Sequence, residues 1–253
     1  MDYKILMDTA ILAGKIMLES NAETYRVEDT MNRILKTSKF ETTEALAMTT
    51  GLVVTLDDPS IDDPITIVKR INIRDINLNN ITKVNTISRQ LTGEKITIPE
   101  AYAALQSIGE VQYKRLYKDI ATAALTASFA LLLGGGFFEI LAAGINGGLL
   151  ALVLKGEKKL NMGSFVRNVL SSAVISVGAV LMQSFIFPTV NMNIVIIGTI
   201  MPLVPGTAIT NAIRDTLQGD YMSGGAKALE AFVVALSIAL GVAIGLVIGG
   251  ALY

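Results

Sequence analysis

The sequence predicts a mixed fold class: an N-terminal cytoplasmic α+β domain, then an all-α membrane domain of five transmembrane helices. The mean hydropathy of +0.53 is too high for a typical soluble protein of 253 residues. Residues 1–119 carry 17 of the 22 acidic and 15 of the 21 basic residues, whereas residues 120–253 carry 18 of the 22 glycines. Apolar stretches typical of membrane helices fill this second part. We therefore expect two domains, over residues 1–118 and 119–253.

Composition also excludes several classes of function. A net charge of −1 argues against a nucleic-acid partner, which needs a basic face. The absence of cysteine removes disulfides and thiol chemistry, and the absence of histidine removes the usual metal ligand and general base. The N-terminus has no basic region leading into an apolar core, so we expect no signal peptide. We expect no metal and no cofactor.

The N-terminal domain is predicted from helical periodicity and from two β-rich runs. Thr24 is expected to be the N-cap of the second helix. The strands are expected over Ala45–Leu56 and Pro64–Arg70. The helices are expected over Tyr3–Ser20, Thr24–Lys39 and Asn77–Gln90, and from Pro99 toward Tyr117.

A dense polar cluster lies at the start of the second helix. It can be a binding or catalytic cluster, with Arg26 holding an acidic group. The alternative is an ordinary acidic helix start with an internal pair between Arg26 and a carboxylate, since acidic first turns are common. Its members are Asn21, Glu23, Arg26, Glu28 and Asp29.

Five spans are predicted in the second part, and the fourth is broken in its middle. Pro202 and Pro205 lack a backbone N–H, and Gly206 adds flexibility beside them. The spans are expected over Ile120–Leu133, Phe138–Leu154, Phe165–Phe187, Met192–Ile213 and Leu229–Leu252.

Basic residues predict the orientation of these spans. Lys and Arg flank only one set of loops, and the opposite loops and the C-terminal end carry none. The positive-inside rule then places the N-terminus in the cytoplasm and the C-terminus outside the inner membrane.

Polar residues near the break are the main functional candidates. Thr207, Asn211 and Arg214 are spaced so that they share one helix face. The half-helix after Pro205-Gly206 offers free N–H groups and a positive dipole end to a carboxylate. The alternatives are a simple packing kink and an interfacial ion pair between Arg214 and Asp215. The candidate substrate-binding residues are Pro205, Gly206, Thr207, Asn211, Arg214 and Asp215.

Two further features concern coupling and packing. Glu139 and Glu230 are the candidate carriers of a coupling ion, since ionisable groups in spans are costly. The glycines at 241, 245 and 249, and at 144 and 148, repeat every four residues and predict close helix contacts, within the chain or between subunits.

Two segments resemble the threonine/serine exporter family. One runs from Gly14 to Arg33 (GKIMLESNAETYRVEDTMNR). The other runs from Met201 to Ala231 and includes MPLVPG, NAIRD and the pairs Gly219-Asp220 and Ser223-Gly224. Single-chain members of that family carry about ten spans, and this chain resembles their first half, as in the split, two-gene form.

The resemblance implies a secondary-active exporter of small carboxylate metabolites, either threonine and serine or a dicarboxylate such as succinate. It also implies a second membrane subunit in a hetero- or homo-oligomer. The sequence has no phosphate-binding loop of the Walker type, so an ion gradient is the expected energy source. Two alternatives stay open: a membrane-anchored carboxylate- or metal-dependent hydrolase, and a non-transporting regulatory subunit.

Overall fold

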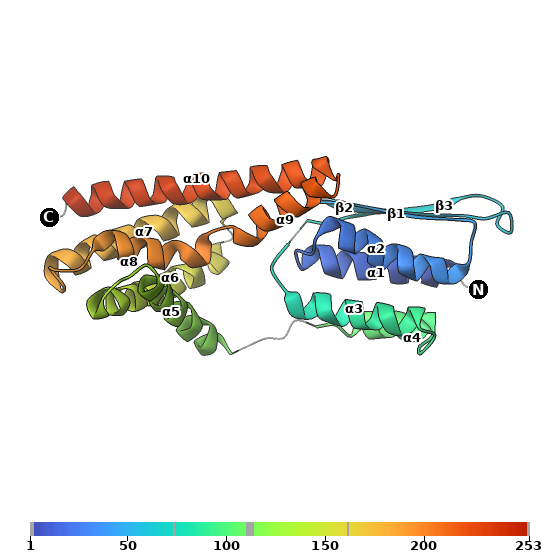
Figure 1. The fold of residues 1–253 in the computed structure, drawn as a ribbon, viewed down its shortest axis with the longest axis horizontal. Coiled ribbons are helices and arrows are strands. Elements are labelled where there is room, and N and C mark those ends of the chain that lie inside the picture. The colour runs from blue at the N-terminus through green and yellow to red at the C-terminus, as the bar shows by residue number, and fades with distance from the viewer. Residues whose placement is uncertain (1–2, 73, 110–113, 161, 252–253) are drawn as a thin grey trace. The chain divides into compact units, whose positions relative to one another are not determined.

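The computed structural model describes residues 3–72, 74–109, 114–160 and 162–251 (Figure 1). The chain forms two compact units. The first comprises Met1–Val111 and Thr207–Ala228, and the second comprises Gln112–Gly206 and Leu229–Tyr253. The stretch Thr207–Ala228 thus packs with the N-terminal residues, although it lies in the part of the sequence that we assigned to the membrane domain.

Four helices of the first unit surround an apolar core. Their buried side chains include Leu6, Met17, Met31 and Leu35, which recur at helical spacing. The helices are α1 (Tyr3–Glu19), α2 (Thr24–Leu35, followed by the 3-10 turn η1, Lys36–Ser38), α3 (Leu78–Thr92) and α4 (Ile98–Gln106).

The sheet of the first unit is antiparallel, in the order β1-β2-β3. Its strands are β1 (Thr42–Met48), β2 (Gly51–Asp57) and β3 (Ile65–Arg70). Met48 pairs with Gly51, so a tight turn divides the region that we predicted as one strand. That prediction was wrong because Thr49 and Thr50 are β-formers, which hid the turn. Alternate residues of β2 enter the core.

Two helix ends also differ from the prediction. Glu23, not Thr24, is the N-cap of α2, and its side chain makes no capping bond. α4 ends at Gln106 and does not reach Tyr117. Its start is as expected, with Pro99 in the first turn and a capping box between Thr97 and Glu100.

The second part of the chain is helical. Its elements are α5 (Arg115–Leu132), α6 (Phe137–Leu160), α7 (Ser164–Phe185), α8 (Met192–Ile200), the 3-10 turn η2 (Met201–Leu203), α9 (Gly206–Leu217) and α10 (Tyr221–Ala251). Helix α8 stops before Pro202 and regular helix resumes at Gly206, as the two prolines require.

Three helices of the described chain are long and apolar enough to cross a membrane: Phe137–Gly156, Ser164–Phe185 and Tyr221–Ala251. The broken pair Met192–Leu203 and Gly206–Leu217 makes a fourth if it is one span. Helix α5 is not among them, and three of its first five residues are charged. The number of five spans stays a prediction.

Glycines of α10 pack against α7 within the second unit. A Cβ on Gly241 would collide with the carbonyl oxygen of Val169, and one on Gly245 with that of Ala173. A Cβ on Gly249 would lie 2.9 Å from the Cβ of Val180. This ladder therefore serves contacts within the chain. In α6 the tight glycine is Gly147, which faces Thr126, whereas Gly148 has open space.

Candidate functional site

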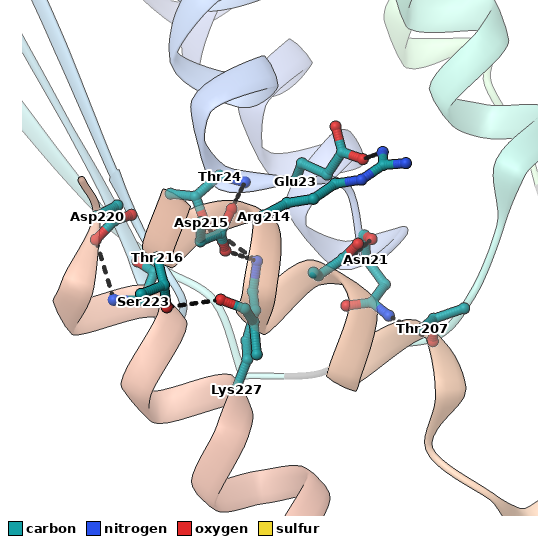
Figure 2. A network of polar contacts seen from close by, with 12 residues as sticks. Asn21, Glu23, Thr24, Thr207, Arg214, Asp215, Thr216, Asp220, Ser223 and Lys227 are labelled. Carbon is teal, nitrogen blue, oxygen red and sulfur yellow. Dashed lines mark hydrogen bonds and ion pairs between the residues drawn. The ribbon is translucent and has the colours of Figure 1, made fainter. Parts of the chain in front are cut away.

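The turn between α1 and α2 contacts α9 within the first unit (Figure 2). Asn21 adopts a left-handed conformation (φ 62°) and ends α1 in a Schellman arrangement, with Ala22 N–H bonded to the carbonyl of Met17. Its Nδ2 lies 3.3 Å from Thr207 Oγ1, and its carbonyl accepts a bond of 3.0 Å from Nδ2 of Asn211. Thr207 and Asn211, which we expected on one face of α9, therefore both contact Asn21.

An ion pair between Glu23 and Arg214 also joins the turn to α9. The side chain of Glu23 is 9% exposed, whereas that of Arg214 is 56% exposed. Arg26 lies 3.9 Å from the second oxygen of Glu23, which is the internal pair that one of the two interpretations of the cluster expects. Arg214 thus combines a fixed partner with a guanidinium that solvent or a solute can still reach.

The next residue pair is fully buried. Asp215 accepts bonds from the N–H of Thr24 (3.2 Å) and the hydroxyl of Thr24 (3.0 Å). Lys227 Nζ lies 2.6 Å from Asp215 Oδ2 and 3.0 Å from Thr24 Oγ1. The side chains of Lys227 and Asp215 are 4% and 0% exposed. Arg214 and Asp215 therefore do not pair with each other, because each has a partner from another segment.

A sharp turn brings Lys227 back to Asp215. α9 ends with Gly219 at φ 90° and with a bond from Asp220 N–H to the carbonyl of Asp215. Asp220 Oδ1 then accepts a hydrogen bond of 3.0 Å from the N–H of Ser223 and so caps the start of α10. The reversal places Lys227 beside Asp215, as Figure 2 shows.

Comparison with known proteins assigns the chain to a family. Residues 8–249 match the family model described as "Putative threonine/serine exporter". The chain belongs to the threonine/serine exporter family. A "Probable threonine/serine exporter" of Mycobacterium tuberculosis is 18% identical over 235 residues, which are 92% of this chain and 44% of that protein. The chain thus spans less than half the length of this relative. No solved structure matches it.

The two segments that carry the family resemblance are the ones that touch in this exporter-family chain. Asn21, Glu23 and Thr24 come from the first segment, and Thr207 to Asp215 come from the second. The polar face of α9 therefore packs on the polar cluster of the N-terminal segment.

The remaining members of the N-terminal cluster point elsewhere. Glu28 accepts the N–H of Ala47 at 2.8 Å, and Asp29 pairs with Arg33 at 2.8 Å. Burial raises the pKa of Glu28, and the carboxylates of Asp220, Glu44 and Asp215 add to this, while the bond from Ala47 opposes it. The carboxylates of the cluster do not converge on one point, as a hydrolytic site would require.

The break itself borders an apolar groove in the second unit. This groove of about 500 Å³ is lined by Val204 and Pro205 and by the small residues Ala235, Ala239 and Ala243 of α10. Gly206 has open space where a Cβ would stand. The polar residues after the break belong to the network described above, and the groove beside Pro205 is apolar.

The two candidate coupling residues lie in the second unit. Glu139 accepts the N–H of Asn191, the residue before α8, at 3.0 Å. Glu230 lies on the exposed surface of α10.

Sequence reasoning missed the part played by Lys227 and Thr24. We used Lys227 only for orientation and Thr24 only as a helix cap. One signal was available: Lys227 is the only basic residue after Arg214, and it precedes a long apolar run. A cation at the edge of a predicted span is expected to have a partner.

Proposed function

We propose that this chain is a subunit of a secondary-active exporter of small carboxylate metabolites in the inner membrane. The observation that supports it is the pair between Glu23 and Arg214, in which Arg214 stays more than half exposed. A guanidinium with free donors is the residue best suited to a carboxylate. A substrate carboxylate would bind Arg214 on its exposed side, with Asn211 and Thr207 on the same helix face.

The charges favour a zwitterionic substrate over a dicarboxylate. Glu23 adjoins Arg214, so a negative charge already lies beside the cation that would bind the substrate carboxylate. A dicarboxylate such as succinate would bring its second negative charge toward Glu23, which is unfavourable. We therefore propose threonine and serine as the substrates. Their hydroxyl groups suit the amide of Asn21 and the hydroxyl of Thr207.

We further propose five spans, a cytoplasmic N-terminus and a second membrane subunit. The distribution of basic residues supports the orientation. The Mycobacterium tuberculosis relative is more than twice as long as the part of it that this chain matches. This supports a second subunit that would correspond to the rest of the relative. Transport then needs both parts, and an ion gradient supplies the energy.

Efflux measured in the source cells tests this function. Cells with the gene deleted, or replaced by a variant, are loaded with labelled threonine or labelled succinate. Loss of Arg214 in an Arg214→Gln strain is expected to reduce threonine efflux about tenfold or more, the loss typical of a charge-assisted contact. The matched control is Arg33→Gln, since Arg33 also pairs with a carboxylate on a helix surface. Equal efflux from the deletion strain and the wild type would contradict the proposal.

A further inference from the structure

The apolar groove beside Pro205 takes no part in the proposed substrate contacts. It lies in the second unit and has a volume of about 500 Å³. One of its walls is the break that follows α8, and the other is α10. Resting on the proposed function, we propose that this groove is the docking site for an apolar transmembrane helix of the second membrane subunit.

The break in the groove needs a cover that can form hydrogen bonds. Pro202 and Pro205 remove two N–H donors from the helical ladder, so regular helix is lost between Ile200 and Gly206. Val204, in the middle of the break, is 40% exposed in this chain. Irregular backbone does not face lipid in the hydrocarbon core, because lipid tails offer no hydrogen-bond partner. The cover over the break is therefore protein rather than a lipid acyl chain.

The other wall of the groove is suited to a helix. Alanines of α10 line it at every fourth residue, and all three are exposed in this chain: Ala235, Ala239 and Ala243. Small residues at this spacing allow a second helix to approach closely.

The chain itself uses the opposite face of α10. Gly241 and Gly245 pack closely against α7. Ala239 and Ala243 each lie two residues from Gly241, which is about 200° around the helix, so they point away from α7. Among the three long apolar helices of the described chain, α10 also has the smallest buried share, 28% against 33% and 50%. The alanine face is therefore left for a partner outside this chain.

The lining of the groove indicates the chemistry of this partner. Between the alanines the wall of α10 presents Ile238, Val242 and Leu246, and no charged side chain lines the groove. A charged group from the partner would lose its water here without gaining a counter-charge. The docking face of the partner helix is therefore expected to be apolar.

The relative from Mycobacterium tuberculosis indicates where such a helix comes from. The matched 235 residues are 44% of that protein, so more than half of it lies outside the match. The proposed second subunit corresponds to this remaining part and supplies the helix. The other protein source is a second copy of this chain, which the test distinguishes.

Site-specific photocrosslinking in the source cells identifies the occupant. The probe is p-benzoylphenylalanine, which inserts into nearby C–H bonds of protein or lipid. It replaces Val204 in the groove or, as the control, Val247, which is 72% exposed on α10 and does not line the groove. The Val204 position is expected to give a protein adduct in about tenfold or greater excess over Val247. Mass spectrometry is expected to place the adduct in a transmembrane segment of a different protein, which matches the rest of the relative.

Three results would overturn the docking site. They are an adduct of Val204 with lipid alone, an adduct with a second copy of this chain, and equal protein adducts at Val204 and Val247.

A substitution that fills the groove gives a second test. Ala239→Leu is expected to lower both the Val204 adduct and threonine efflux about tenfold or more. The melting temperature of the purified chain alone should stay unchanged, because the larger side chain enters the open groove. The matched control is Ala251→Leu, at an exposed position of α10 outside the groove.

The outcomes separate this proposal from the exporter function. Wild-type efflux and adduct yield in Ala239→Leu would overturn the docking site and leave the exporter function standing. A Val204 adduct with the second protein, in cells without gene-dependent threonine efflux, would support the docking site and contradict the exporter function.

Discussion

The carboxylate of Asp215 lies 2.6 Å from Nζ of Lys227, and both side chains are buried. The turn at Gly219 makes this contact possible, because it reverses the chain between α9 and α10. Thr24 joins the same carboxylate from the start of α2. Asp215 and Lys227, which are 12 residues apart, thus meet Thr24, which lies 191 residues from Asp215, and substitutions at this charged group are expected to have large effects.

Lys227→Met is expected to destabilise the protein by about 3–5 kcal/mol, because it leaves the Asp215 carboxylate buried without its cation. The measurement is denaturant or thermal unfolding of the purified full chain in detergent. The double variant Asp215→Asn/Lys227→Met is expected to recover most of the loss, since neither charge is then left alone. A single variant as stable as the wild type would show that the pair is open to water.

Gly245→Ala is expected to cost about 1–3 kcal/mol of stability, because its Cβ has no room against α7. The added carbon would meet the backbone carbonyl of Ala173 and lie 2.7 Å from the Cβ of Ser176. Thermal unfolding in detergent measures the effect. Gly250→Ala is the matched control in the same helix, since that position has open space. Equal stability of the two variants would contradict the packing of α10 on α7.

Local sequence signals predicted most helices of the fold. α1 and α3 fall where apolar residues recur at helical spacing, and Pro202 and Pro205 predicted the break after Ile200. These features are encoded within a few residues of where they occur. The β-hairpin was missed because its turn contains Thr49 and Thr50, which are typical of strands.

The site could be predicted only in part. The helical spacing of Thr207, Asn211 and Arg214 placed them correctly on one face. Their partners could not be derived, because Lys227 and Thr24 are 203 residues apart and no local pattern encodes such a contact. The prediction that these polar groups serve the membrane break also neglected the alternative that they pack on the N-terminal segment.

Glu28 predicts a pH dependence of stability. Its pKa is raised in the folded protein by burial. The folded state therefore binds a proton more tightly than the unfolded state, so stability is greatest below the ordinary pKa of glutamate and falls as pH rises through the raised value. Glu28→Gln keeps an oxygen for the N–H of Ala47 and removes the charge. Its melting temperature is expected to exceed that of wild type increasingly as pH rises from about 4, until the pH has passed the raised pKa of Glu28. Parallel curves for the two proteins would exclude this contribution.

Asn21 combines a backbone role with a side-chain role, and two substitutions separate them. Its φ of 62° is tolerated by asparagine and glycine but costs an alanine about 1–2 kcal/mol. Its Nδ2 also donates to Thr207, while its carbonyl accepts from Asn211. Asn21→Ala is therefore expected to lower the free energy of unfolding by about 1–2 kcal/mol, and Asn21→Gly to lower it by less. Both variants keep the carbonyl and lose the amide, so the difference between them isolates the backbone strain.

Threonine efflux should fall in both the Asn21→Ala and the Asn21→Gly variant if the amide of Asn21 binds the substrate hydroxyl. A fall in Asn21→Ala alone would assign this residue to shaping the turn.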